Sequence, residues 1–192
     1  MNQQETMEKS LLSEIDGYLM NLVYLKDLIE VEKSLAEASV VNEFAPNFSL
    51  ITQCALYDSY MLCLMKLYDK SEKAKTIPNL IRKCKNNVTL FRSPDEVSKR
   101  LVEWEGKINS DKFITPTIKT LRMRRDQYHV HNDKKYFGEK IVNDTSHLKN
   151  YHILILRDFT EEILFYLWNQ LTDEKHRETK YNDDLKNLLE KV

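Results

Sequence analysis

The sequence predicts an all-α protein, an antiparallel helical bundle with additional flanking helices. Glycine and proline are scarce, at 3 and 4 of 192 residues, so turns are few and the elements should be long. Apolar residues recur at spacings of three and four along most of the chain, which is the period of an amphipathic helix. We therefore expect one domain over residues 1–192, with little or no sheet.

The first two helices should both be long. The first covers about residues 8–38, where an apolar stripe repeats at helical spacing. Residues 42–47 are expected to form a turn. The second helix covers about residues 48–70, and its apolar side chains surround almost the whole circumference. That pattern is typical of a central core helix, so Cys54 and Cys63 are expected to be buried free thiols.

Two shorter helices should follow. Thr76 can cap the free N–H groups of the first, which has Pro78 in its first turn and runs to about Asn86. The second begins at residues 93–96, Ser-Pro-Asp-Glu, a sequence typical of a helix start.

The last part of the chain should hold three helices. Thr115 and Pro116 open the first, which extends past residue 125. A loop marked by Gly138 precedes a strongly apolar helix over residues 146–171. A charged and weakly amphipathic helix, loosely packed, is expected over residues 177–192.

Charge and cysteine content narrow the function classes. The formal net charge is −1, so contact with nucleic acid would need a local basic surface. No pair of cysteines has the spacing of a zinc or redox motif, and we expect neither a metal nor a cofactor. The amino terminus is polar and no uncharged apolar stretch is long enough to span a bilayer. We expect a cytoplasmic protein that does not bind a membrane.

One arginine occupies an unexpected position in the helix that begins at Thr115. Ile114, Ile118 and Leu121 form an apolar stripe, and Arg125 falls on the same stripe. A charge on a core-facing stripe is costly unless it is paired or serves a site. Arg122 and Arg124 lie off the stripe, which indicates a solvated face.

Two histidines follow, and their chemistry suits an RNA phosphodiester. A histidine titrates near neutrality and can move the proton of a 2′-hydroxyl, while an arginine can stabilise the extra charge on phosphorus. From Lys119 to Lys135 there are six basic and two acidic residues, the only marked basic concentration in the sequence. Helical geometry alone leaves open whether His129 or His131 pairs with Arg125.

The same residues also admit a purely structural interpretation. Arg125 could be a buried arginine paired with a core acid such as Asp69, with His129 and His131 as surface or capping residues. Periodicity and composition leave this alternative open.

The segment Arg125-Asp-Gln-Tyr-His-Val-His131-Asn-Asp133 resembles the defining motif of the HEPN (higher eukaryotes and prokaryotes nucleotide-binding) superfamily, an arginine followed after four to six residues by a histidine. The wider sequence is similar to the abortive-infection AbiU-type branch. A second similarity lies upstream, in the helix that ends in Leu-Tyr-Asp69-Lys and the short helix after it. The resemblance covers about residues 48–133.

The resemblance implies a HEPN-like bundle and a metal-independent endoribonuclease, a toxin or antiviral defence effector that acts as a homodimer with both motifs in one shared cleft. It makes Arg125 and His131 catalytic. It also implies supporting roles and RNA-phosphate contacts for a further set of residues: Asp126, His129, Asn132 and Asp133 as supporting residues, and Arg122, Arg124 and Lys134 as phosphate contacts.

The motif departs from the family pattern in ways that keep other functions open. Gln127 and Val130 replace the usual lysine and alanine, and Asp133 stands where some HEPN toxins carry a tyrosine that is silenced by adenylylation. An antitoxin partner acting on that tyrosine is not supported, although another antitoxin is compatible. The alternatives are a catalytically inactive module that binds RNA, nucleotide or protein, and a structural dimer assembled through residues 146–171.

Overall fold

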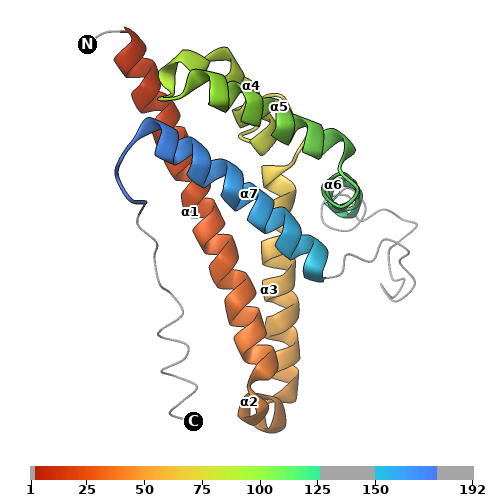
Figure 1. Cartoon of the computed structure of the whole chain (residues 1–192). Helices are drawn as coiled ribbons and strands as arrows, with labels where there is room; N and C mark the ends of the chain where they lie inside the picture. Colours follow the sequence, from red (N-terminus) through yellow and green to blue (C-terminus); the bar gives the residue numbers. More distant parts are fainter. Residues whose placement is uncertain (1–2, 126–149, 177–192) are drawn as a thin grey trace.

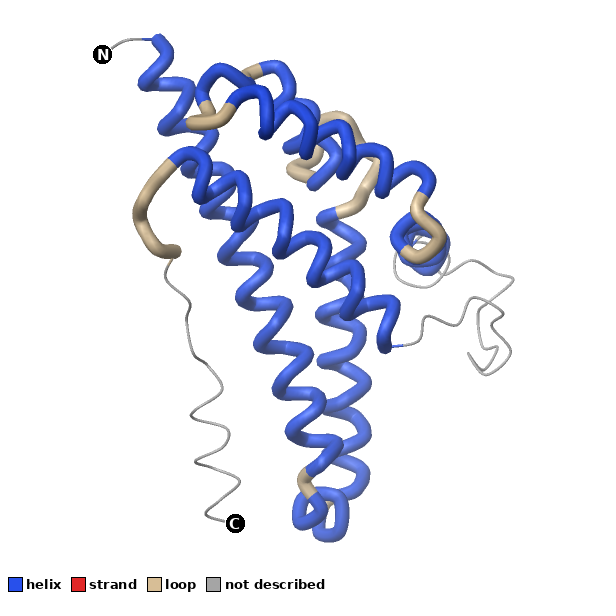
Figure 2. The backbone as a smooth tube through the Cα atoms, viewed as in Figure 1, coloured by secondary structure: helices blue, strands red, loops and turns tan. Residues whose placement is uncertain are grey.

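The computed structural model describes residues 3–125 and 150–176, and over these residues the secondary structure is helical (Figures 1 and 2). This confirms the predicted all-α fold. The helices are α1 (Gln3–Glu37), α2 (Ser39–Phe44), α3 (Pro46–Leu67), α4 (Ile77–Asn86), the 3-10 turn η1 (Val88–Leu90), α5 (Pro94–Ser110), α6 (Ile114–Arg124) and α7 (Asn150–Leu171).

Helices α1 and α3 form a long antiparallel pair that α2 closes at its tip (Figure 1). The short helices α4, α5 and α6 gather at the other end of the pair, and α7 packs across α1. Among the described residues, no helix is long and apolar enough to cross a membrane.

The core lies where α7 and the short helices enclose the α1–α3 pair. Fully buried side chains come from every one of these helices, as periodicity predicts. One representative of each shows the pattern: Ile15 in α1, Leu64 in α3, Leu80 in α4, Trp104 in α5, Leu121 in α6 and Ile163 in α7. Polar ties join the layers, because the indole of Trp104 donates to Glu162 at 3.1 Å and Lys26 pairs with Glu161 at 2.8 Å.

The predicted helix starts after Thr76 and Ser93 are confirmed. Thr76 is the N-cap of α4, and its hydroxyl accepts a hydrogen bond from the backbone N–H of Asn79 at 3.3 Å. Helix α5 begins at Pro94, directly after Ser93. Local sequence determines these two boundaries because the cap and the proline act within one turn.

The turn expected over residues 42–47 is wrong in its position. Residues 39–44 form the short helix α2, and the break falls at Ala45. Asn42 does not interrupt the helix, because its amide donates to the backbone carbonyls of Leu35 and Ala36. Those carbonyls lie at the end of α1, where the helix supplies no N–H group to donate to them. The side chain of Asn42 provides the missing donor.

Helix α3 is a core helix over only half of its length. From Tyr60 to Leu67 it contributes five buried side chains, whereas between residues 46 and 59 only Ser49 is buried. The expectation that the whole helix is central is therefore wrong for its first half. The cysteines follow this division, because Cys54 is exposed and Cys63 is half-buried.

Candidate functional site

The carboxyl end of α3 and the carboxyl end of α6 meet around Arg125. Nη1 of Arg125 lies 2.6 Å from Oδ1 of Asp69 in an ion pair. Arg125 follows directly after α6, and its backbone N–H still donates to the carbonyls of the last turn. Asp69 follows α3, so two helix ends position the two charges.

Asp69 is held in place by the backbone around it. Its Oδ1 accepts the backbone N–H groups of Lys70 at 2.5 Å and Ser71 at 3.3 Å. The hydrogen bond from Arg125, helped by these backbone N–H groups, lowers the pKa of Asp69 below its usual value of 3.8. The carboxylate is therefore charged at neutral pH and fixes the guanidinium beside it.

This ion pair is not sealed in the core. The side chains of Arg125 and Asp69 are 27% and 29% exposed. Asp69 is thus the partner that the structural interpretation expected, but the burial that this interpretation assumed is absent. A partly exposed, oriented guanidinium can meet a phosphate from solution.

Arg122 lies on the neighbouring turn of α6 and binds the same end of α3. Its Nε donates to the carbonyl oxygen of Tyr68 at 2.7 Å. Partial burial lowers the pKa of Arg122, and the charge of Asp69 acts in the opposite direction. Tyr68 is itself anchored, because its buried hydroxyl lies 2.7 Å from Oγ1 of Thr160 in α7.

Arg124 does not lie on the solvated face where the sequence placed it. Its side chain is only 8% exposed, and Nη1 donates to the hydroxyl of Tyr57 in α3 at 3.2 Å. The cause is a shift of register, because Thr117 is buried and donates to its own helix at the carbonyl of Phe113. The inward stripe therefore includes Thr117 and Arg124, and Arg125 lies at its edge.

The remaining predicted site residues lie outside the described residues: Asp126, His129, His131, Asn132, Asp133 and Lys134. The structure thus brings together Arg122, Arg125 and Asp69. Tyr57 and Tyr68 also contact the arginines, and neither contact is expected from the sequence. Tyr68 offers a backbone carbonyl, for which no sequence signal exists. Tyr57 is expected only as part of the apolar surface of its helix, and nothing in the sequence indicates that its hydroxyl accepts from Arg124.

Comparison with known proteins places the chain in a family. Neither the curated proteins nor the solved structures give a match. The sequence model of the family described as AbiU2, within the HEPN group, matches residues 18–191, which include α3, α6 and the Arg125–His131 segment. Because the match covers most of the 192 residues, the chain belongs to the AbiU2 family of abortive-infection HEPN proteins.

Proposed function

We propose that this protein is a metal-independent endoribonuclease, a toxin or antiviral defence effector that acts in the cytoplasm. The observation that carries the proposal is the Arg125–Asp69 ion pair, which orients a guanidinium at a solvent-accessible junction of two helix ends. The resemblance of residues 125–133 to the HEPN motif supports the proposal, because it makes Arg125 the first and His131 the last catalytic residue of that motif.

In the proposed reaction the 2′-oxygen of RNA attacks the adjacent phosphorus, and the bond from phosphorus to the 5′-oxygen of the next nucleotide breaks. His131 takes the proton of the 2′-hydroxyl or protonates the leaving 5′-oxygen, since an imidazole titrates near neutral pH. Arg125 binds the phosphate and stabilises the charge that grows on its oxygens. Asp69 is a positioning residue, because it acts on the reaction through Arg125.

The other motif residues support these two. Asp126, His129, Asn132 and Asp133 are proposed as supporting residues of the site. Arg122 and Lys134 are proposed to contact phosphates of the RNA, because both side chains are positively charged. A phosphate contact from Arg124 would require its side chain to leave Tyr57, and it is therefore not part of the proposed machinery.

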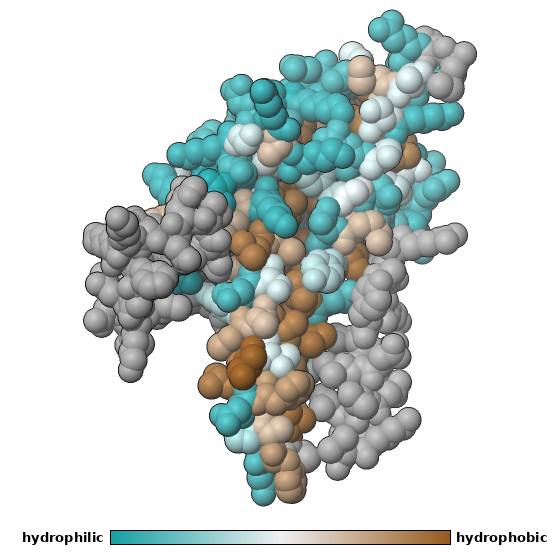
Figure 3. Space-filling view, turned by 180° about the vertical axis from the view of Figure 1, so that it is seen from behind, coloured by the Kyte–Doolittle hydropathy of each residue, from teal (hydrophilic) through white to brown (hydrophobic). Residues whose placement is uncertain are grey.

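A homodimer is the proposed active form, and one surface supports it. An exposed apolar face, here called the tip face, lies on α2 and the first half of α3. It consists of Phe44, Phe48, Leu50, Ile51 and Cys54. Figure 3 shows hydrophobic side chains gathered over this narrow part of the molecule. Phe44 and Phe48 are 80% and 62% exposed, which amounts to about 200–350 Å² for these two rings alone.

A second copy of the chain is the occupant that suits the tip face. Residues 44–57 contain no charged side chain, so a charged partner would find no counterpart there. An uncharged face can pair with itself about a two-fold axis. A contiguous apolar patch of this kind is typical of an interaction site and fits the apolar centre of an interface of about 800 Å² per partner.

The direction of the two-fold axis decides whether the sites meet. Ile51 and Leu67 are about 24 Å apart along α3, at a rise of about 1.5 Å per residue. A two-fold axis parallel to α3 would bring both Arg125–Asp69 pairs to the same end of the dimer. A perpendicular axis would place them about 50 Å apart, so the proposed shared cleft requires the parallel arrangement.

A cleavage assay tests the assignment. Wild-type protein is expected to cut single-stranded RNA in the presence of EDTA and to leave a 2′,3′-cyclic phosphate. His131→Ala should abolish cutting, whereas His129→Ala should retain it. Cutting that continues in His131→Ala would refute the role of His131, and a requirement for added metal would refute the mechanism.

A catalytically inactive RNA-binding module is the second candidate. The ion pair of Arg125 favours it, because a side chain held by Asp69 can also serve a purely structural role. Under this alternative the wild-type protein binds RNA and cuts none of a varied set of RNAs.

A further inference from the structure

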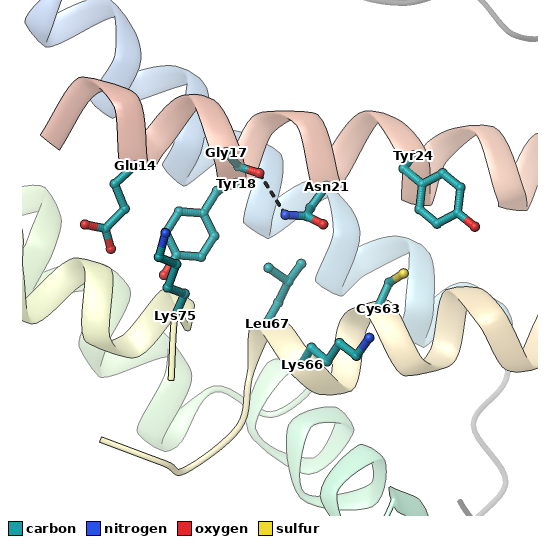
Figure 4. A pocket seen from close by; sticks show the side chains of 9 residues that line it. All are labelled: Glu14, Gly17, Tyr18, Asn21, Tyr24, Cys63, Lys66, Leu67 and Lys75. Atoms are coloured by element: carbon teal, nitrogen blue, oxygen red, sulfur yellow. Dashed lines mark hydrogen bonds between the residues drawn. The ribbon is translucent and has the colours of Figure 1, made fainter. Parts of the chain in front are cut away.

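A groove of about 380 Å³ lies between α1 and α3, near the carboxyl end of α3. Figure 4 shows Asn21 and Tyr24 extending from α1 and Cys63 and Lys66 from α3, with Lys75 at one end. The floor is closed by Tyr18, whose hydroxyl donates to the carbonyl of Thr76 at 3.1 Å. The groove thus combines apolar, aromatic and cationic groups with one carboxylate, that of Glu14.

One segment of the chain, residues 66–75, connects the groove to Asp69, the partner of Arg125. Lys66 lies one helical turn before Asp69, and the connection from Asp69 to Thr76 carries Lys75 into the groove. Residues 66–75 hold four exposed lysines, here called the lysine strip: Lys66, Lys70, Lys73 and Lys75. With Asp69 and Glu72 in the same segment, residues 66–75 carry a net charge of only +2, so the lysine strip is not apparent as a basic concentration in the sequence alone.

The acids near the lysine strip are already paired with other cations. Asp69 pairs with Arg125, Glu72 lies 3.9 Å from Arg82, and Glu14 in the groove pairs with Lys83 of α4. Among the described residues, no acidic side chain forms an ion pair with any of the four lysines. All four lysines are exposed, and the carboxylates nearest to them in the described residues, including Glu14 in the groove, pair with other cations.

An aromatic side chain accompanies these charges. Tyr24 lines the groove and is 51% exposed, so one face of its ring is open to a ligand. Lysines that follow a phosphate backbone, together with an exposed aromatic ring on which a base can stack, are the recurring elements of single-stranded nucleic acid binding. Asn21 also lines the groove, and its amide nitrogen donates to the backbone carbonyl of Gly17 at 2.8 Å.

We infer that the α1–α3 groove binds a nucleotide of single-stranded RNA flanking the cleaved bond, with a base stacked on Tyr24 and phosphates on Lys66 and Lys75. The lysine strip leads the strand from Arg125 into the groove. The inference rests on the proposed ribonuclease function for the identity of the strand, and it extends that function to residues far from the motif.

Equilibrium binding tests the inference. The full chain carrying His131→Ala, which is not expected to cut, is titrated with a labelled short single-stranded oligoribonucleotide at several salt concentrations. Lys66→Gln with Lys75→Gln should reduce the slope of log affinity against log salt by about 1.4, since each lost phosphate contact on a single strand removes about 0.7. Tyr24→Ala should weaken binding at least about fivefold.

Matched variants separate binding from folding. Tyr24→Phe keeps the ring and should keep the affinity. Lys9→Gln with Lys99→Gln removes two exposed lysines from α1 and α5 outside the groove and should leave the salt slope nearly unchanged. Affinity and slope that stay at the parent level in the groove variants would overturn the inference, as would equal affinity for an acidic peptide.

The outcome for the groove is distinguishable from the outcome for catalysis. Groove-dependent RNA binding without cleavage by the wild-type protein would support the groove and refute the ribonuclease. Cleavage and RNA affinity that are both unchanged by the substitutions at Tyr24, Lys66 and Lys75 would support the ribonuclease and overturn the groove assignment.

Discussion

The two halves of α3 both carry many apolar side chains, but they have opposite surroundings. From Tyr60 to Leu67 the helix is enclosed by its own chain, and its end at Asp69 holds Arg125. From Pro46 to about Ser59 it meets mainly α1 and α2, and most of its apolar side chains face solvent. The enclosed half positions charges, and the open half presents an apolar surface.

The difference shows that an apolar circumference does not by itself identify a core helix. The pattern of α3 indicates that every side should be covered, and it does not indicate which chain covers it. The enclosed half packs against α1 and α6. Tyr68, which follows it, is tied to Thr160 of α7. On our account a second copy covers the open half, so one helix connects the dimer surface to the site.

Alanine substitutions should separate the two halves most strongly. Leu64→Ala creates a cavity in the core and should lower the free energy of unfolding by about 2–5 kcal/mol. Leu50→Ala, at a 62% exposed position, should lower it by less than about 0.5 kcal/mol in dilute, monomeric protein. Urea unfolding of both variants checks this, and equal losses would remove the distinction between the halves.

Charge placed on the tip face should act on association and spare the fold. Ile51→Glu should raise the dissociation constant of the dimer at least about thirtyfold, because it buries an unpaired charge at the centre of the interface. Val102→Glu on α5, at a similarly exposed apolar position, should leave the constant unchanged. Sedimentation equilibrium gives both constants, and a wild-type protein that stays monomeric at micromolar concentration would contradict the dimer.

Removing the carboxylate at the enclosed end should have a smaller and pH-dependent effect. Asp69→Asn should lower the free energy of unfolding by about 1 kcal/mol at neutral pH, since the ion pair is partly exposed. The pKa of Asp69 is depressed in the folded state, so its contribution is present above the usual value of 3.8 and is lost as pH falls below it. Urea unfolding at pH 7, 5 and 3 should show that the free energies of unfolding of the two proteins converge at the lowest pH. A difference that stays constant with pH would show that it does not arise from the ionisation of Asp69.

Much of the fold could be predicted because its signals are local. Thr76 and Pro94 act within one helical turn, and the stripe of α1 from Leu11 to Leu25 needs only helical periodicity. The tip of the α1–α3 pair could not be predicted, since Asn42 caps α1 through the carbonyls of Leu35 and Ala36 instead of opening a turn.

Of the predicted site residues the structure describes Arg122, Arg124 and Arg125, and their surroundings could be predicted only in part. Arg124 could not be placed on the buried stripe of α6, because this stripe passes through the polar Thr117. Thr117 is buried since its hydroxyl donates to a backbone carbonyl of the same helix. Asp69 was identifiable as a potential partner of Arg125 by its charge. The unpaired lysines of residues 66–75 were not, because the pairing of Asp69 and Glu72 with arginines depends on tertiary contacts.

The central claim is that Arg125, held by Asp69, stabilises charge on a cleaved RNA phosphate. The most direct test compares the rate of RNA cleavage in EDTA for Arg125→Ala and for Arg92→Ala, an exposed arginine that pairs with Asp173 beyond the far end of α7. We predict a loss of at least about a hundredfold for Arg125→Ala and none for Arg92→Ala. Equal rates in the two variants would contradict the claim.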